Sequence, residues 1–288
     1  EAFVARAYVA VGISPKEAAN IAELQVRADL IGADGHGVFR LPQYVRRIKG
    51  AAVNLKPNIR VEREAPGMAL VNGDNGMGHL VMRFATEKAI EKAKTVGVAW
   101  VGVEHSNHAG PASLYAGMPM AHDMIGLYLA VGNANHLPPW GGIDMLLSTN
   151  PIAVAVPADK EPPIVLDMAT TVAAYGKVKA RAKRGEPMPE GWMIDREGKP
   201  LLDPKRSEEG FLTPIGGYKG YGLSLIVGLL AFLLGLQWWS SRNEISDLRR
   251  ELAQRLQSGD NMNIQTNYTH TIRDSIATPD GSSYDGVG

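Results

Sequence analysis

Short apolar runs of strand length, set between segments with helical signals, constrain the fold of this chain more than any other feature. Val98–Val103, Ile125–Val131 and Ile152–Val156 are apolar and bounded by glycine, proline or polar residues, as strands of a sheet are. The segments between them carry start and stop signals of helices. We therefore expect both helices and strands, with functional sites where the strands end.

Two helices have explicit boundary signals. Ser14 and Glu17 form a capping box, so a helix begins there and is expected to run to about Ile31. A second helix is expected over Leu80–Val96, because Gly97 follows it as an end signal. The residues of the first helix that we expect to face inward are Ala18, Ile21, Ala22, Leu24 and Ala28.

Composition excludes several classes of function. Thirty basic side chains balance thirty acidic ones, so no overall charge attracts nucleic acid or an anionic membrane. The absence of cysteine removes disulfides, thiolate catalysis and sulfur-ligated metals, and it suits a reducing compartment. The first residues lack the basic segment and apolar core of a signal peptide. We therefore expect a cytoplasmic protein without a nucleic-acid partner.

The stretch Asp34–Tyr44 gathers functional side chains within a turn and a half of chain. His36 lies between two glycines, so the backbone can turn sharply and present an imidazole that its neighbours do not bury. Arg40 and Tyr44 follow at intervals of four residues, and Pro42 suits the start of a helix. These groups can hold a carboxylate and move a proton. The alternative is a glycine-rich helix terminus with an exposed histidine.

The strand Val98–Val103 leads into a polar stretch that contains His105 and His108. Polar residues at the end of a buried strand are a common place for a site. The two histidines suggest a metal, but no carboxylate or third histidine stands at ligand spacing, so no metal site is predicted. A metal-dependent hydrolase that uses the histidines is kept as an alternative function.

A second glycine-rich stretch, Pro214–Gly222, has Lys219 at its centre and opens a helix. Glycines let the backbone approach a ligand closely, and Lys219 can meet a phosphate or a ribose. The alternative is an ordinary helix entrance, because the chain has neither a GxGxxG nor a Walker pattern.

Taken together, these motifs resemble the second type of malate/L-lactate dehydrogenases, a family that includes ureidoglycolate and sulfolactate dehydrogenases and diketogulonate reductase. The resemblance covers about residues 1–230, and its motifs stand in the family's order. They are Gly35-His36-Gly37, Asn107-His108-Ala109-Gly110, Pro139-Trp140-Gly141-Gly142, Thr149-Asn150-Pro151, Asp167-Met168-Ala169-Thr170 and Lys219-Gly220-Tyr221-Gly222-Leu223.

The resemblance implies an α+β fold with a mostly antiparallel sheet flanked by helices, and a dinucleotide-binding fold that is not a Rossmann domain. We divide the chain into three regions on this basis. Residues 1–72 form an N-terminal helical region on the substrate side, and residues 73–236 form the sheet domain that binds NAD or NADP. Residues 237–288 are a divergent amphipathic helix with a polar tail. The resemblance also implies a homodimer.

The implied activity is hydride transfer between a nicotinamide cofactor, NAD or NADP, and a small 2-hydroxy or 2-keto acid. Hydride transfer to a ketone leaves an alkoxide that needs a proton, and histidine most often supplies it near neutral pH. By matching position, His36 and His108 are the candidates for proton transfer. Arg40 and Tyr44 are the candidates for binding the substrate carboxylate. The candidates for contact with the cofactor are Asn133, Thr149, Asn150, Pro163, Ile164, Val165, Leu166, Asp167, Met168, Ala169, Tyr218 and Lys219.

The chain departs from the family's pattern in two places. Gly35 stands where members commonly carry a serine beside the histidine, so a hydroxyl that orients the ring is absent. After Leu230 the motifs end, and residues 220–241 contain no charge over a length that can span a bilayer. We favour a buried helix here. The alternative is a truncated or inactive scaffold that serves in dimerisation or is tethered to a membrane through 220–241.

Overall fold

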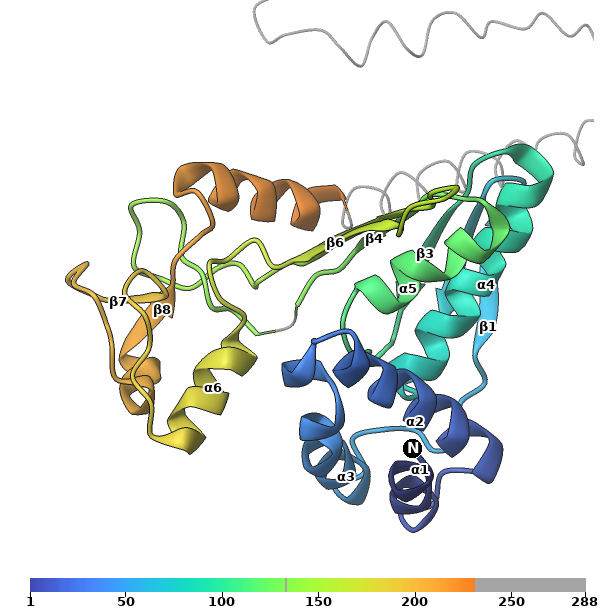
Figure 1. Ribbon diagram of the computed structural model, residues 1–288, viewed down its shortest axis with the longest axis horizontal. Coiled ribbons are helices and arrows are strands. Elements are labelled where there is room, and N and C mark those ends of the chain that lie inside the picture. Colours follow the sequence, from blue (N-terminus) through green and yellow to red (C-terminus); the bar gives the residue numbers. More distant parts are fainter. Residues whose placement is uncertain (133, 231–288) are drawn as a thin grey trace, which may run out of the picture. The chain divides into compact units, whose positions relative to one another are not determined.

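The computed structural model describes residues 1–132 and 134–230 (Figure 1). Its first layer consists of three helices, α1 (Ala2–Val9), α2 (Pro15–Leu30) and α3 (Leu41–Lys49). The predicted capping box is confirmed, because Ser14 Oγ accepts a hydrogen bond from the Glu17 N–H at 3.4 Å. The predicted inward face of α2 is also confirmed, since each of its members is at most 1% exposed: Ala18, Ile21, Ala22, Leu24 and Ala28.

The first sheet has the strand order β1-β2-β3. Strand β1 (Arg60–Ala65) pairs antiparallel with β2 (Met68–Asn72), and β2 pairs parallel with β3 (Trp100–Glu104). A parallel pair needs a crossover connection, and α4 (Gly78–Val96) provides it while packing Val81 and Ala85 against the sheet. The chain then leaves α4 through Gly97 with a positive φ of 88°, so the predicted end signal is confirmed.

The second sheet, β4-β5-β6, is antiparallel throughout. Its strands are β4 (Gly126–Leu129), β5 (Ile152–Val156) and β6 (Ile164–Met168). The short helix α5 (Ser113–Gly117) lies on one face, and small side chains let it approach closely. The contact consists of Ala112, Ala116, Ala153 and Ala155, all buried.

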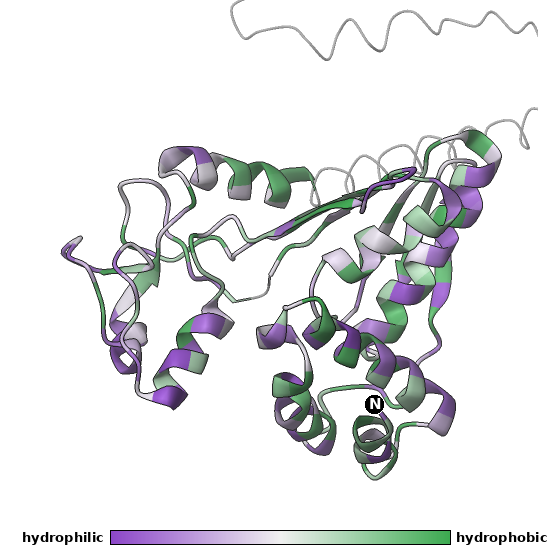
Figure 2. Ribbon diagram, viewed as in Figure 1, coloured by the Kyte–Doolittle hydropathy of each residue, from purple (hydrophilic) through white to green (hydrophobic). Residues whose placement is uncertain are grey.

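A smaller unit follows the second sheet. The helix α6 (Tyr175–Arg184) packs on the antiparallel pair of β7 (Met193–Asp195) and β8 (Gly210–Leu212) through a buried cluster that includes Val178. The remainder of α6 is largely hydrophilic (Figure 2). A last helix covers residues 218–230, the end of the described chain.

The predicted α+β class with mostly antiparallel strands is confirmed. Within the described residues, every pair of named strands except β2 with β3 is antiparallel. The predicted region boundaries after residues 72 and 236 stay predictions, and the predicted region 237–288 lies outside the described residues.

The predicted buried helix is described only in part. Over residues 218–230 one face is buried, with Ser224 at 0% and Val227 at 2% exposure, while Ile226 is 51% exposed. Residues 231–241 lie outside the described part. No helix in the described ranges has both the length and the apolar character to cross a membrane.

Candidate active site

His36 and His108 lie together although they come from distant parts of the chain. Their ring centroids are 5.5 Å apart and their planes are inclined by only 11°, so the rings are stacked. His36 ends the 3₁₀ turn η1 (Asp34–His36), between α2 and α3, and His108 lies in the loop between β3 and α5. Two titratable rings therefore face the same space, which is a condition for acting on one substrate atom.

The protonation of His108 is constrained by two hydrogen bonds at Nδ1. The backbone N–H of Gly110 donates to this nitrogen at 3.3 Å, and the Tyr44 hydroxyl lies 2.6 Å from it. A backbone N–H can only donate, so Nδ1 is an acceptor and the Tyr44 hydroxyl donates to it as well. The neutral ring then carries its proton on Nε2, where it can serve as a hydrogen-bond donor.

The surroundings also keep both rings neutral near pH 7. Removal of water lowers the pKa of His108, and the neighbouring His36 and Arg40 lower it further. The pKa of His36 is lowered by burial first and by Arg40 second, while the charge of Asp167 raises it. The ring nitrogens of His36 have no hydrogen-bond partner among the described residues. They are therefore open to a ligand.

Tyr44 reaches His108 from the interior. It belongs to α3 and is only 3% exposed, so its hydroxyl is committed to His108. The start of α4 packs against the loop that carries His108, because Gly78 has no side chain. A Cβ at Gly78 would lie 2.1 Å from the Asn107 carbonyl oxygen, so any other residue would displace this loop.

A third histidine, His79, lies behind Tyr44 and was not singled out from the sequence. Its ring meets that of Tyr44 edge to face, with centroids 5.3 Å apart. His79 is 0% exposed, neither ring nitrogen has a hydrogen-bond partner among the described residues, and burial lowers its pKa to about 4. The only signal in the sequence was a lone histidine near a helix start, which does not distinguish a core residue from a site residue.

Arg40 lies beside the histidine pair with part of its guanidinium in use. Its Nε donates to the Gly35 carbonyl at 2.8 Å and its Nη1 donates to Gln43 at 2.7 Å. A Cβ at Gly176 would lie 2.8 Å from Nη2, so the guanidinium lies close to the first turn of α6. Nothing lies within 4 Å of a Cβ built at Gly35, so this position has room for the serine that the chain lacks.

The end of β6 brings Asp167 towards the histidines. Its carboxylate accepts a hydrogen bond from the Ser113 N–H at 2.8 Å, at the start of α5, and its charge acts on His36. The preceding predicted cofactor residues lie on the open edge of the sheet and are exposed: Pro163, Ile164, Val165 and Leu166. Met168 and Ala169, which follow Asp167, are partly buried.

The glycine-rich stretch lies next to the end of β6. The Val172 N–H donates to the Thr213 carbonyl at 2.9 Å, and the Ile215 N–H donates to the Thr170 carbonyl at 3.0 Å. Helix 218–230 starts directly afterwards, with Tyr218 and Lys219 exposed on its first turn. Tyr218 makes an edge contact with the exposed Trp140, at 6.1 Å between centroids. Among the described residues no hydrogen bond joins Lys219 to the histidine pair.

The other predicted cofactor residues have different positions. Asn150 is 1% exposed, and its side chain donates to the Ser224 carbonyl at 2.9 Å and accepts from the Gly132 N–H at 3.3 Å. It thus braces helix 218–230 from the interior. The Thr149 carbonyl accepts from Thr170. Asn133 lies outside the described residues.

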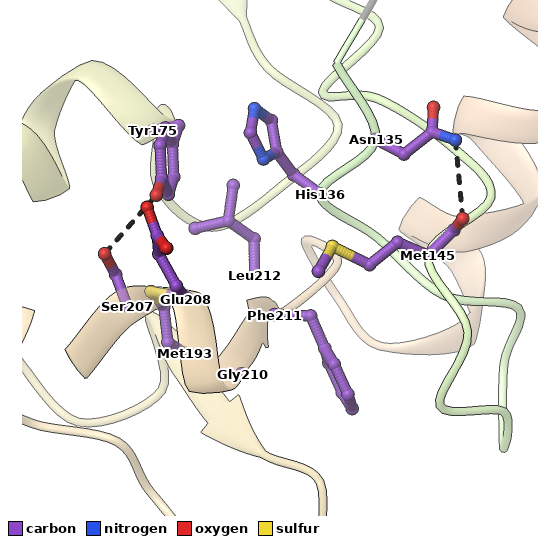
Figure 3. A pocket seen from close by; sticks show the side chains of 10 residues that line it. All are labelled: Asn135, His136, Met145, Tyr175, Met193, Ser207, Glu208, Gly210, Phe211 and Leu212. Atoms are coloured by element: carbon purple, nitrogen blue, oxygen red, sulfur yellow. Dashed lines mark hydrogen bonds between the residues drawn. The ribbon is translucent and has the colours of Figure 1, made fainter.

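One cavity of about 300 Å³ lies apart from these residues (Figure 3). The rings of His136 and Tyr175 stack at its wall, 4.3 Å apart, and the Tyr175 hydroxyl contacts Ser207 at 3.3 Å. None of the predicted site residues lines it. The described chain also contains no group of three histidine, aspartate or glutamate side chains arranged to hold a metal. The candidate site is the stacked pair of His36 and His108, with Tyr44 bonded to His108.

Comparison with known proteins identifies relatives. The family model for malate/L-lactate dehydrogenase matches residues 1–260, which extends beyond the predicted limit of the resemblance at about residue 230. Malate dehydrogenase of Pyrococcus horikoshii is 42% identical over 249 residues, which are 83% of this chain and 68% of that protein. Ureidoglycolate dehydrogenase (NAD(+)) of Escherichia coli K12 is 34% identical over 78% of this chain and 64% of its own length.

Solved structures agree with these matches. The sulfolactate dehydrogenase of Methanocaldococcus jannaschii superposes with a TM-score of 0.71 at 39% identity, covering 79% of this chain and 65% of that one. The chain thus spans about two thirds of the length of these relatives.

Burial of neutral His79 predicts a loss of stability in acid. Its pKa lies near 4 in the folded state and near 6.5 when unfolded, so the unfolded chain binds more protons between these values. The free energy of unfolding should therefore fall as the pH drops from 6.5 to 4, by up to ~3 kcal/mol from this ring.

Urea unfolding of the His79→Leu variant tests this. The pH slope of its free energy of unfolding below pH 6.5 should be smaller than that of the parent by about one proton. The matched change at a surface histidine, His122→Leu, controls for the exchange of a histidine for leucine as such. Equal slopes for His79→Leu and the parent protein would show that His79 takes up no proton on unfolding.

Proposed function

Because the chain belongs to the malate/L-lactate dehydrogenase family, we propose that it is a 2-hydroxy acid dehydrogenase that uses NAD or NADP. The stacked pair of His36 and His108 carries this proposal. The ring nitrogens of His36 have no hydrogen-bond partner among the described residues, and neutral His108 carries its proton on Nε2. The pair therefore offers both a proton acceptor and a hydrogen bond to one substrate oxygen.

The residues near the end of β6 fit a nicotinamide dinucleotide. Trp140 and Tyr218 are 58% and 62% exposed and offer aromatic surface to a planar base, and the exposed Lys219 offers a cation to a phosphate. These residues and the edge of β6 would hold the cofactor, and a relative's name specifies NAD(+). When bound, the nicotinamide gives or accepts the hydride.

The two histidines have different roles at the substrate oxygen: one transfers the proton and the other donates a hydrogen bond. In oxidation, neutral His36 takes the proton of the substrate hydroxyl on a ring nitrogen, and in reduction it returns that proton to the developing alkoxide. His108 donates its Nε2–H to the same oxygen and remains neutral. Tyr44 keeps His108 in this state, because its hydroxyl is already bonded to Nδ1. Tyr44 was predicted to share the substrate carboxylate with Arg40, but its hydroxyl bonds His108. We therefore leave the carboxylate to Arg40, whose Nη2 makes no hydrogen bond within the described residues.

The names of relatives favour a substrate with two anionic groups. Arg40 and Lys177 both lower the pKa of His36, and Arg47, which bonds Asn107 at 2.9 Å, lowers that of His108. Asp34 and Asp167 raise the pKa of His36, so they offset two of these three positive charges, and the charges do not by themselves select a second anionic group. Relatives are named for malate and sulfolactate, which each carry a carboxylate and a second anion. We extend this preference to the present chain.

A second candidate is a family scaffold without activity, which serves in dimerisation. The observation behind it is that the family's motifs end before residue 230, within a stretch, 220–241, that carries no charge. For the first candidate, the dehydrogenase, we propose a homodimer in the cytoplasm. Cofactor binding separates the two candidates.

Fluorescence titration with NADH and NADPH tests the proposal. At least one should bind saturably, and turnover of oxaloacetate should exceed that of pyruvate at least about tenfold in kcat/KM, because a charge-assisted hydrogen bond contributes ~1.5–3 kcal/mol. The His36→Ala variant should bind the cofactor and lose turnover. No binding of either nucleotide would refute the proposed activity, and equal turnover of both keto acids would refute the dianionic preference.

Removal of the Tyr44 hydroxyl tests whether this hydroxyl keeps His108 a neutral hydrogen-bond donor. Tyr44→Phe should lower kcat about tenfold, the value of one hydrogen bond of ~1.4 kcal/mol. It should also raise the pH at which activity is lost in acid, because His108 loses a donor at Nδ1 and protonates more easily. The control Tyr175→Phe removes a hydroxyl bonded to Ser207, away from the site. If the dependence of activity on pH in Tyr44→Phe coincides with that of the parent protein, the proposed role of Tyr44 in keeping His108 neutral is contradicted.

A further inference from the structure

A buried chain of hydrogen bonds runs from α1 through α2 to the turn that carries His36. The Tyr8 hydroxyl donates to Gln25 Oε1 at 2.8 Å, and Gln25 Nε2 donates to the Gly37 carbonyl at 2.9 Å. Tyr8 and Gln25 are both 0% exposed. Gly37 follows His36 directly, so the chain ends one peptide away from the candidate catalytic ring.

The orientation of the Gln25 amide is fixed by its partners. A carbonyl oxygen can only accept, so the NH₂ group of Gln25 must face Gly37. The remaining amide oxygen then accepts from Tyr8, whose pKa is raised by burial, so its hydroxyl keeps the proton it donates. Neither end of the amide can turn over without leaving a buried group unsatisfied.

A second residue of α2 holds the other side of the same turn. The Asp29 carboxylate accepts from the Val38 N–H at 3.0 Å. Gln25 and Asp29 are four residues apart, so they lie on one face of the helix. The backbone of the turn packs directly against this face of α2, since a Cβ at Gly37 would lie 1.8 Å from Asp29 Oδ1. The backbone immediately after His36 is therefore held at two successive residues, Gly37 and Val38.

Packing alone does not account for a glutamine at this position. Val4 and Ile21 show that α1 and α2 pack through apolar side chains, and a buried polar side chain is unfavourable unless each of its groups is paired. We propose that Gln25 is a positioning residue that holds the Gly37 carbonyl and thereby aligns the His36 ring with His108 for proton transfer. This role rests on the proposed dehydrogenase function.

The consequence of losing the amide is a displaced ring. Without Gln25 the Gly37 carbonyl has no partner, and the peptide that follows His36 is free to rotate towards another donor. The stacking at 5.5 Å then changes. A displacement of ~1 Å at a reacting group can reduce turnover ~100-fold.

Three variants separate positioning from stability. Gln25→Leu leaves Tyr8 and Gly37 without partners, so both the urea midpoint and kcat should fall, kcat by about 10- to 100-fold. The double variant Tyr8→Phe/Gln25→Leu also removes the stranded hydroxyl, so much of the lost stability should return while kcat stays low. Ile21→Val, a buried change on the same helix, should lower the urea midpoint and keep kcat.

A readout without turnover keeps this test independent of the proposed function. Burial and Arg40 hold the pKa of His36 below its usual range, so NMR titration should show this pKa rising towards 6.5 in the double variant and not in Ile21→Val. If the parent protein has no turnover but this shift occurs, the dehydrogenase proposal fails and the positioning of His36 stands. If kcat returns together with stability in the double variant, or the His36 pKa does not move, the positioning role is overturned.

Discussion

The hydrogen bonds at Nδ1 of His108 are the constraint on which the site depends. The Gly110 N–H and the Tyr44 hydroxyl both donate to this nitrogen. A proton on Nδ1 would point at these two donors and would remove the acceptor that they need. His108 is thereby kept as a neutral ring with its proton on Nε2. We therefore propose that proton transfer falls to His36, whose ring nitrogens have no hydrogen-bond partner among the described residues. A stacked pair of similar rings is in this way given two unequal roles.

The fold serves to bring this pair together and to hold each ring from behind. The crossover helix α4 reaches the His108 loop because Gly78 permits contact with the Asn107 carbonyl. Helix α2 holds the turn after His36 through the amide of Gln25. The two helices thus act on the rings through contacts with the backbone beside each ring.

Much of the architecture was predictable, because local signals determine it. The Ser14 capping box and the Gly97 helix end act within a few residues, and both are present. The motifs were enough to assign the family, since their order along the chain is specific. The supporting residues could not be found. Gln25 and His79 are single polar residues in amphipathic helices, and only the packed structure shows what surrounds them.

The unequal roles of the two histidines are tested most directly by nitrogen-15 NMR of the histidine rings in the ligand-free protein between pH 5 and 8. The account predicts that His108 stays neutral throughout this pH range with its proton on Nε2. His36 should take up a proton only at a pH below the usual pKa of histidine. A proton on Nδ1 of His108, or titration of His108 near pH 6.5, would contradict it.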